Sequence, residues 1–155
     1  MPRRSTPVLA LLAAAACLLT ACGDNQEPAA ARALHRQIHE QDYRSWRRAP
    51  GYETRRKAEA PHSDSVDIYV NDVVAAALDA GEPLQEWPVG SLIVKDGFDG
   101  DDHEIIAVME KRDDGWFWAE YFDDDDAKYS GRPDICLECH ERGGNDYVRA
   151  FQLPR

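Results

Sequence analysis

The chain has 155 residues, of which 43% are hydrophobic and 30% are charged, and this length and composition suit one domain with one hydrophobic core. It carries 29 acidic against 18 basic residues, which gives a net charge of −11. A surface this acidic repels nucleic acid and anionic lipid, so the composition excludes a nucleic-acid-binding protein and a protein held on membranes by a basic patch.

The N-terminus predicts an export signal followed by a lipid anchor. Two arginines precede an apolar run over residues 8–21, which is too short for a comfortable membrane span. The junction Leu19-Thr20-Ala21-Cys22 resembles a bacterial lipobox, in which the cysteine is lipidated; an ordinary cleavage site with Cys22 left over is the alternative. We therefore expect a lipoprotein signal peptide over 1–21, a tether over 22–28 and one domain over 29–155, exported to the periplasmic side and anchored in a membrane.

The first half of the mature chain predicts two helices and one strand. Residues 27–48 read as a helix, because Ala31, Leu34 and Ile38 recur at spacings of three and four and the chain then meets a Pro-Gly pair. Residues 66–70 read as a short strand. Asn71 is typical of the N-cap of a second helix, which is expected to end at Gly81.

The second half predicts an antiparallel meander. Three strands, over residues 91–95, 104–111 and 116–122, are rich in β-branched and aromatic residues and are separated by turns of Gly and Asp. Both faces of the last two strands are apolar, so both faces must be covered. The two helices can cover one face, and haem, a second subunit or both can cover the other. We therefore predict an α+β fold, with N-terminal helices packed on an antiparallel β meander.

The segment Cys136-Leu137-Glu138-Cys139-His140 has the spacing of a c-type haem attachment site. Two thiols three positions apart can each form a thioether with a haem vinyl group, and the adjacent imidazole can ligate the iron. Half of a zinc site or a redox disulfide is the alternative, although the chain has no second Cys pair to complete a zinc site. We therefore predict one covalent haem c near the C-terminus, with Cys136 and Cys139 binding the haem and His140 binding the iron.

The function of such a haem depends on the sixth position of the iron. His62, His103 and Met109 are the candidate sixth ligands, and His62 is the best of them, because Met109 reads as core and His103 opens a strand at a turn. A filled position indicates a six-coordinate electron-transfer cytochrome, and an open one indicates ligand chemistry. The basic segment Arg55-Arg56-Lys57 is expected to be a solvated loop, and contact with haem propionates is the alternative.

Seven segments follow one another in an order and spacing that together are specific for one protein family, although no single segment besides the haem motif is. They are Tyr43-Arg44-Ser45-Trp46, Val66-Asp67-Ile68-Tyr69-Val70-Asn71-Asp72, Trp87-Pro88-Val89-Gly90-Ser91-Leu92-Ile93-Val94-Lys95, Val108-Met109-Glu110-Lys111, Gly115-Trp116-Phe117-Trp118, the haem motif, and Asp146-Tyr147-Val148. In this order they resemble the cytochrome P-460 family, which also includes the cytochromes c′-beta. The resemblance spans nearly the whole mature chain.

The resemblance implies a homodimeric, mainly antiparallel β cytochrome with one five-coordinate haem. His140 would be the proximal ligand, and the distal side would be open to small nitrogen species. In the P-460 members a lysine is bonded covalently to the porphyrin, and it lies in the segment that this chain writes as Ser91-Leu92-Ile93-Val94-Lys95. Those members oxidise hydroxylamine, whereas the cytochromes c′-beta lack that chemistry and bind nitric oxide.

Lys95 is therefore the residue on which the assignment turns. Strand parity places it on the face of Ile93, and a haem cross-link and an ordinary strand-end lysine are both open interpretations. Glu110 and Glu120 lie on otherwise apolar strands and are the candidates for a distal base. We predict a cytochrome that binds or oxidises hydroxylamine or nitric oxide, with a possible oxidoreductase activity and a redox partner protein. A six-coordinate electron carrier and a nitric oxide sensor or scavenger are the alternatives.

Overall fold

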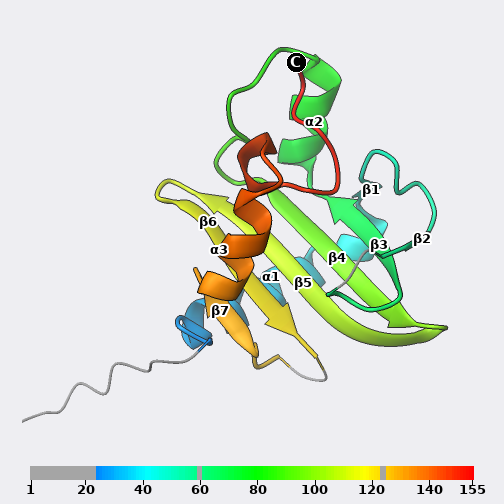
Figure 1. Cartoon of the computed structure of the whole chain (residues 1–155), viewed down its shortest axis with the longest axis vertical. Helices are drawn as coiled ribbons and strands as arrows, with labels where there is room; N and C mark the ends of the chain where they lie inside the picture. The colour runs from blue at the N-terminus through cyan, green and yellow to red at the C-terminus, as the bar shows by residue number, and fades with distance from the viewer. Residues whose placement is uncertain (1–23, 59–60, 123–124) are drawn as a thin grey trace, which may run out of the picture.

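The structure is a computed structural model of the chain, and it describes residues 24–58, 61–122 and 125–155. The predicted signal peptide and the predicted lipidation site Cys22 lie outside the described residues. Within those residues, three α-helices and one antiparallel sheet of seven strands form the α+β fold that the sequence predicts (Figure 1).

The sheet is built around the predicted meander. Its strands are β4 (Leu92–Asp99), β5 (Asp102–Arg112) and β6 (Gly115–Tyr121). The β4–β5 turn contains Gly100, whose φ of 57° lies in the left-handed region that glycine adopts without strain. The remaining strands are β3 (Ser65–Val70) beside β4, β7 (Tyr129–Gly131) beside β6, and the two-residue strands β1 (Arg47–Arg48) and β2 (Arg56–Lys57), which both pair with β3.

The helix α1 (Pro28–Glu40) covers one face of the sheet. Its predicted apolar stripe of Ala31, Leu34 and Ile38 is buried in one cluster with sheet residues such as Val94 and Val108. Ile38 is fully buried, so this stripe is the part of the helix that is removed from water. The helix therefore lies on the face opposite to that of Ile93 and Lys95.

The first helix is shorter than predicted. It ends at Glu40 rather than at residue 48, because Asp42 adopts a left-handed backbone conformation with a φ of 47° that an α-helix does not accommodate. A 3-10 turn, η1 (Tyr43–Ser45), follows, and the indole N–H of Trp46 donates to the carbonyl of Gln41. The apolar residues after Glu40 therefore belong to a turn that packs on the sheet.

The opposite face is covered by segments that are far apart in the sequence. α2 (Asp72–Ala80) places Val74 in a cluster with Trp87 and Phe151, and α3 (Asp134–Glu141) is followed by the 3-10 turn η2 (Asn145–Tyr147) on the same side. Figure 1 shows α3 in front of β5 and β6. The two N-terminal helices thus lie on opposite faces, and the expectation that both cover one face is wrong.

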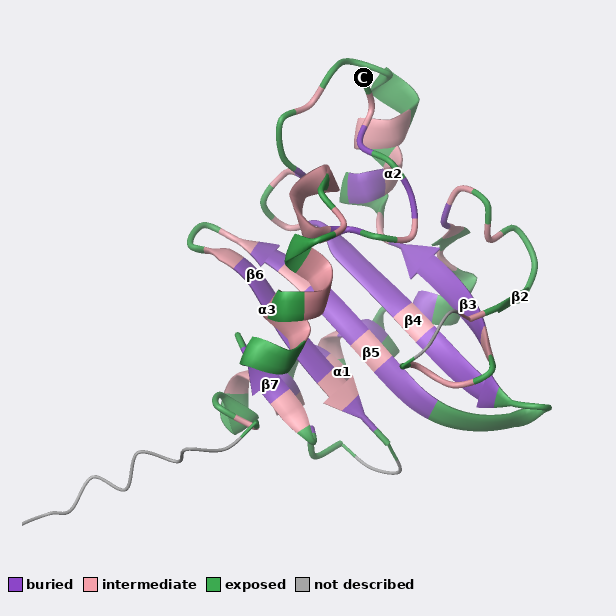
Figure 2. Ribbon diagram, viewed as in Figure 1, coloured by how far each residue is buried: buried purple, intermediate pink, exposed green. Residues whose placement is uncertain are grey.

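A band of half-buried residues crosses the middle of this second face. Lys95 on β4, Ala107 on β5 and Glu120 on β6 are neighbours in the strand register, and each is half-buried on strands that are otherwise largely buried (Figure 2). Adjacent strands are about 4.8 Å apart, so the band is about 10 Å wide from β4 to β6. The core side chains do not fill this part of the face, and a cavity lies over it.

Candidate functional site

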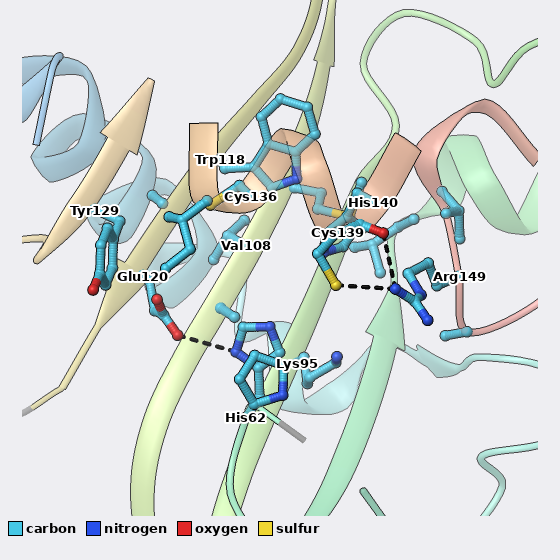
Figure 3. Close-up of a pocket in the computed structure, with 18 of the residues that line it drawn as sticks. His62, Lys95, Val108, Trp118, Glu120, Tyr129, Cys136, Cys139, His140 and Arg149 are labelled. Carbon is cyan, nitrogen blue, oxygen red and sulfur yellow. Dashed lines mark hydrogen bonds and ion pairs between the residues drawn. The ribbon is translucent and has the colours of Figure 1, made fainter. Parts of the chain in front are cut away.

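A cavity of about 290 Å³ lies between α3 and the middle of the sheet. Residues of the central strands β4, β5 and β6 form its floor, and α3 lies over it (Figure 3). The side chains with chemical or structural roles around it are His62, Lys95, Met109, Trp118, Glu120, Cys136, Cys139, His140 and Arg149. The fold therefore brings the cysteine motif together with Lys95 and Glu120, which the sequence singled out separately.

Cys136 and Cys139 reach the cavity from neighbouring positions on α3. Residues three apart lie on the same side of a helix, so both thiols line the cavity, and both are free and half-buried. Burial, together with the nearby Glu120 carboxylate, raises the pKa of the Cys136 thiol to about 12. The guanidinium of Arg149 donates to the Cys139 carbonyl over 2.8 Å and to its Sγ over 2.9 Å.

His140 has a defined protonation state. Its Nδ1 lies 2.8 Å from the carbonyl oxygen of Tyr147, which can only accept, so Nδ1 carries the proton and Nε2 has the free lone pair. Burial lowers the pKa of His140 to about 4, so the ring is neutral at neutral pH. A neutral imidazole with an unprotonated Nε2 and a carbonyl partner on Nδ1 is the form in which histidine ligates a metal ion.

Lys95 lies on the floor of the cavity, on the same face as Ile93, as strand parity predicts. Burial lowers the pKa of its amine, and the charge of Arg149 lowers it further, while Cys139 and Glu120 act in the opposite direction. Among the described residues, no carboxylate forms an ion pair with this amine. An amine with a lowered pKa is unprotonated for a larger fraction of the time and is therefore a better nucleophile.

Glu120 and His62 form a hydrogen-bonded pair at the cavity. Glu120 Oε1 lies 3.0 Å from His62 Nδ1, and the two side chains are only 15% and 20% exposed. A carboxylate accepts, so Nδ1 donates, and Nε2 of His62 is left with its lone pair. Figure 3 shows this contact between His62, from the segment before β3, and Glu120, from β6.

The structure does not bring the other candidates to this cavity, with one exception. Glu110 lies on the opposite face of the sheet, where Arg112 contacts it over 2.6 Å. His103 contacts Asp96 over 3.1 Å, and Asp96 faces away from its neighbour Lys95. Met109 is buried in the cavity floor. In the part of the chain that the structure describes, no three His, Cys, Asp or Glu side chains are grouped so that they could hold a metal ion by themselves.

Trp118 belongs to the site, although only its position on one face of the strand could be predicted from the sequence. The indole N–H is buried, yet it has no hydrogen-bond partner among the described residues. Buried polar groups nearly always have a partner, so an unpartnered donor beside a cavity is a position that a bound group can satisfy. The ring also packs against His140, with 6.1 Å between the ring centroids.

A second, cationic cavity of about 460 Å³ adjoins the first. The two share several residues, including His62, Lys95 and Arg149, and the second is also lined by Arg56 and Lys57. It is a local concentration of positive charge in a chain whose net charge is −11. The position of Arg149 was not predictable, because it depends on how the C-terminal segment folds back over α3.

Within the described residues, no helix has the length and apolar character needed to cross a bilayer.

No curated protein and no solved structure gives a significant match to the chain. One family model, described as cytochrome P-460, matches residues 40–149, which is more than half of the chain and includes every cavity residue named above. Proteins of that family carry a covalently attached haem c and are typically exported, and one haem c is the cofactor of this protein. The chain belongs to the cytochrome P-460 family.

Proposed function

We propose that this protein is a mono-haem cytochrome that binds or oxidises small nitrogen compounds, hydroxylamine or nitric oxide, at an open iron position. Cys136 and Cys139 would hold the haem and His140 Nε2 would ligate its iron. The observation that carries this proposal is that two thiols and one neutral imidazole converge on a single cavity. When bound, haem supplies the redox chemistry and the ligand position, and the chain supplies access, polarity and proton acceptors.

The side chains around the cavity fit this group. The thiols lie on one side of α3, and the floor is apolar at Ile93 and Met109. The N–H of Trp118, which has no partner among the described residues, is a donor that a bound group could satisfy. Haem also carries two carboxylates, and the adjoining cationic cavity suits them through Arg56 and Lys57. Arg55 is already engaged, because it stacks on Phe98 at 3.4 Å and pairs with Asp67.

An open sixth position is supported by where the potential ligands lie. His103 is on the other face of the sheet, and Met109 is only 8% exposed within the floor. The second candidate function, a six-coordinate electron carrier, is favoured by one observation: His62 lines the cavity, and Glu120 holds only its Nδ1. Measurement of ligand binding to the ferrous protein separates these two functions.

Oxidation of hydroxylamine releases protons as well as electrons. We propose that the His62–Glu120 pair accepts the protons, because an imidazole and a carboxylate are hydrogen-bonded to each other at the cavity. Electrons would leave to an external redox partner protein. Lys95 is the candidate for a covalent bond to the haem, and its lowered pKa and its place on the floor support that role.

We also propose that the mature protein begins at a lipidated Cys22 and that it forms a homodimer. Of the predicted tether over 22–28, Gln26 and Glu27 hydrogen-bond to Ser130 on β7 and Pro28 begins α1, so this part of the segment belongs to the domain. The apolar side chains of Phe122 and Ile135 support a partner at the cavity rim, because they line the cavity and are 41% and 59% exposed. The lipid would anchor the protein on the periplasmic side, since its acidic surface does not attract anionic membranes.

The experiment that tests the proposal is the absorption spectrum of the purified ferrous protein with and without carbon monoxide. We expect a high-spin spectrum that changes when carbon monoxide is added. Sharp low-spin bands that carbon monoxide leaves unchanged would instead establish the electron carrier. Mass spectrometry of proteolytic peptides should place the mass of haem on the peptide that contains Cys136 and Cys139.

The same spectrum tests Lys95. If this lysine is bonded to the haem, the ferrous Soret band is red-shifted in the native protein and returns to the position of an ordinary haem c in Lys95→Ala. Lys128→Ala is the matched control, because Lys128 also lines the cavity. A red shift that survives in Lys95→Ala would show that the bond lies elsewhere or does not exist.

A further inference from the structure

The segment that follows the haem motif has an unusual backbone. Gly144, Asn145, Asp146 and Tyr147 all have positive φ, with values of 62°, 48°, 51° and 66°. Only glycine adopts this region freely; Asn and Asp tolerate it, and a bulky residue such as Tyr seldom does. Four such residues in succession persist only where the surrounding structure holds them, and strained backbone of this kind is concentrated at functional sites.

Two residues from distant parts of the chain hold this segment. The Asp146 carboxylate accepts from the buried ammonium of Lys111 over 2.9 and 3.1 Å, and from the backbone N–H of Trp87 over 2.9 Å. The indole of the same Trp87 donates to the carbonyl of Asn145 over 3.2 Å. Lys111 and Trp87 are 6% and 0% exposed, so these contacts are sheltered from water. We call the contact between Lys111 and Asp146 the Lys111–Asp146 anchor.

The strained segment ends at the carbonyl that orients His140. Tyr147 is the residue directly after Asp146, and its carbonyl accepts the Nδ1 proton of His140 over 2.8 Å. The direction of that carbonyl follows from the backbone angles on either side of it. A contact that fixes Asp146 therefore fixes the partner of His140, and this partner sets the tautomer and the basicity of the ring.

We propose that Lys111 and Asp146 are positioning residues for His140: the anchor holds residues 144–147 in the left-handed conformation, which aims the Tyr147 carbonyl at Nδ1 and so strengthens Nε2 as an iron ligand. The proposal rests on the proposed function in one respect, that His140 ligates the iron. It adds that the strength of this ligand is set from β5, 29 residues earlier in the chain, by a side chain outside the haem cavity.

The test uses the mature, haem-loaded protein and two variants that remove the anchor in different ways. Lys111→Met removes the ammonium, and Asp146→Asn removes the carboxylate charge while it keeps an acceptor for the Trp87 N–H. Two measurements are made: the iron–histidine stretching band in the resonance Raman spectrum of the ferrous protein, and hydrogen exchange of the backbone over residues 143–148. In both variants we expect the band to broaden and move to lower frequency, and exchange of this segment to become about tenfold faster or more.

Two controls separate positioning from a general loss of stability. Glu86 also contacts Lys111 over 3.0 Å, but its side chain is 71% exposed, so Glu86→Gln should leave both measurements unchanged. Asp67→Asn weakens a different sheltered ion pair, with Arg48 and Arg55, and should lower stability without moving the Raman band.

An unchanged Raman band in both anchor variants would overturn the proposal, and so would an equal shift in Asp67→Asn. If neither anchor variant can be isolated with haem, faster exchange over residues 143–148 in Lys111→Arg, which keeps the charge in a different shape, supports the anchor, and unchanged exchange overturns it. A native protein that has low-spin bands and does not bind carbon monoxide would instead refute the open site, and the exchange measurement would still decide whether the anchor holds the segment.

Discussion

Glu120 is expected to stabilise the proton that its partner His62 accepts in the cavity, and Glu120→Gln isolates that role, because glutamine keeps the shape of the side chain and one acceptor oxygen. Glu120 lies 3.0 Å from His62 Nδ1, and both side chains are largely removed from water, so a protonated His62 would be held by a charge-assisted hydrogen bond. Such a bond contributes about 1.5–3 kcal/mol. Since about 1.4 kcal/mol is a factor of ten in rate, the substitution should slow hydroxylamine oxidation by about 10- to 150-fold.

The assay is the steady-state oxidation of hydroxylamine with a soluble electron acceptor, compared at equal haem content. Glu110→Gln is the matched control, because Glu110 is the same residue type on a neighbouring strand but faces the other side of the sheet. If the protein binds nitric oxide without turnover, the stretching frequency of carbon monoxide on the ferrous iron is the readout, and only Glu120→Gln should shift it. An unchanged rate and frequency in Glu120→Gln, or an equal effect in Glu110→Gln, would refute the reasoning.

Two further predictions concern the other face of the sheet. Asp96 is fully buried, and it accepts hydrogen bonds from the Tyr43 hydroxyl over 2.7 Å and from Arg44 over 2.8 Å. Asp96→Ala should therefore lower the free energy of unfolding, measured by urea titration, by about 3 kcal/mol. A loss below about 1 kcal/mol would contradict this prediction. Burial and the charge of Arg44 lower the pKa of His39 below its ordinary value of 6.5, so as the pH falls below 6.5 the unfolded chain takes up a proton before the folded protein does, and stability is lost. His39→Gln should therefore flatten the decline in stability between about pH 6.5 and pH 5, and equal slopes in the two proteins would show that His39 makes no contribution.

Much of the fold could be predicted from the sequence, because helix caps and the spacing of apolar residues depend on residues that are close together in the chain. Asn71 caps α2, where its side chain accepts from the N–H of Val74 over 3.3 Å, and Gly81 ends the helix with a φ of 63°. The apolar stripe of α1 and the order of the meander strands were predicted for the same reason. The end of α1 was not, because the residues after Glu40 continue the apolar trend while Asp42 takes a left-handed conformation.

The candidate site was predictable only as far as strand parity reaches. Parity places Lys95 on the face of Ile93, and it places Glu120 on the face opposite to that of Ala119 and Tyr121. It does not say which face of a sheet that is apolar on both sides lines the cavity. That choice depends on where α3 packs. It brings Glu120 to the cavity, together with His62, which is 58 residues away, and leaves Glu110 on the far face. The Lys111–Asp146 anchor joins residues 35 apart through the same long-range packing, so no pattern in the sequence indicates it.

The half-buried band across the sheet has a consequence for how easily this site can be altered. Ala107 lies in register between Lys95 and Glu120, and its side chain is a single methyl group. The depth of the floor at this point is therefore set by one small residue, with the side chains of Lys95 and Glu120 on either side of it. A larger side chain at this position would raise the floor without disturbing the core on the α1 face, because alternate strand residues point away from it. The size of the molecules that the site admits is thus adjustable separately from the chemistry of Lys95 and Glu120.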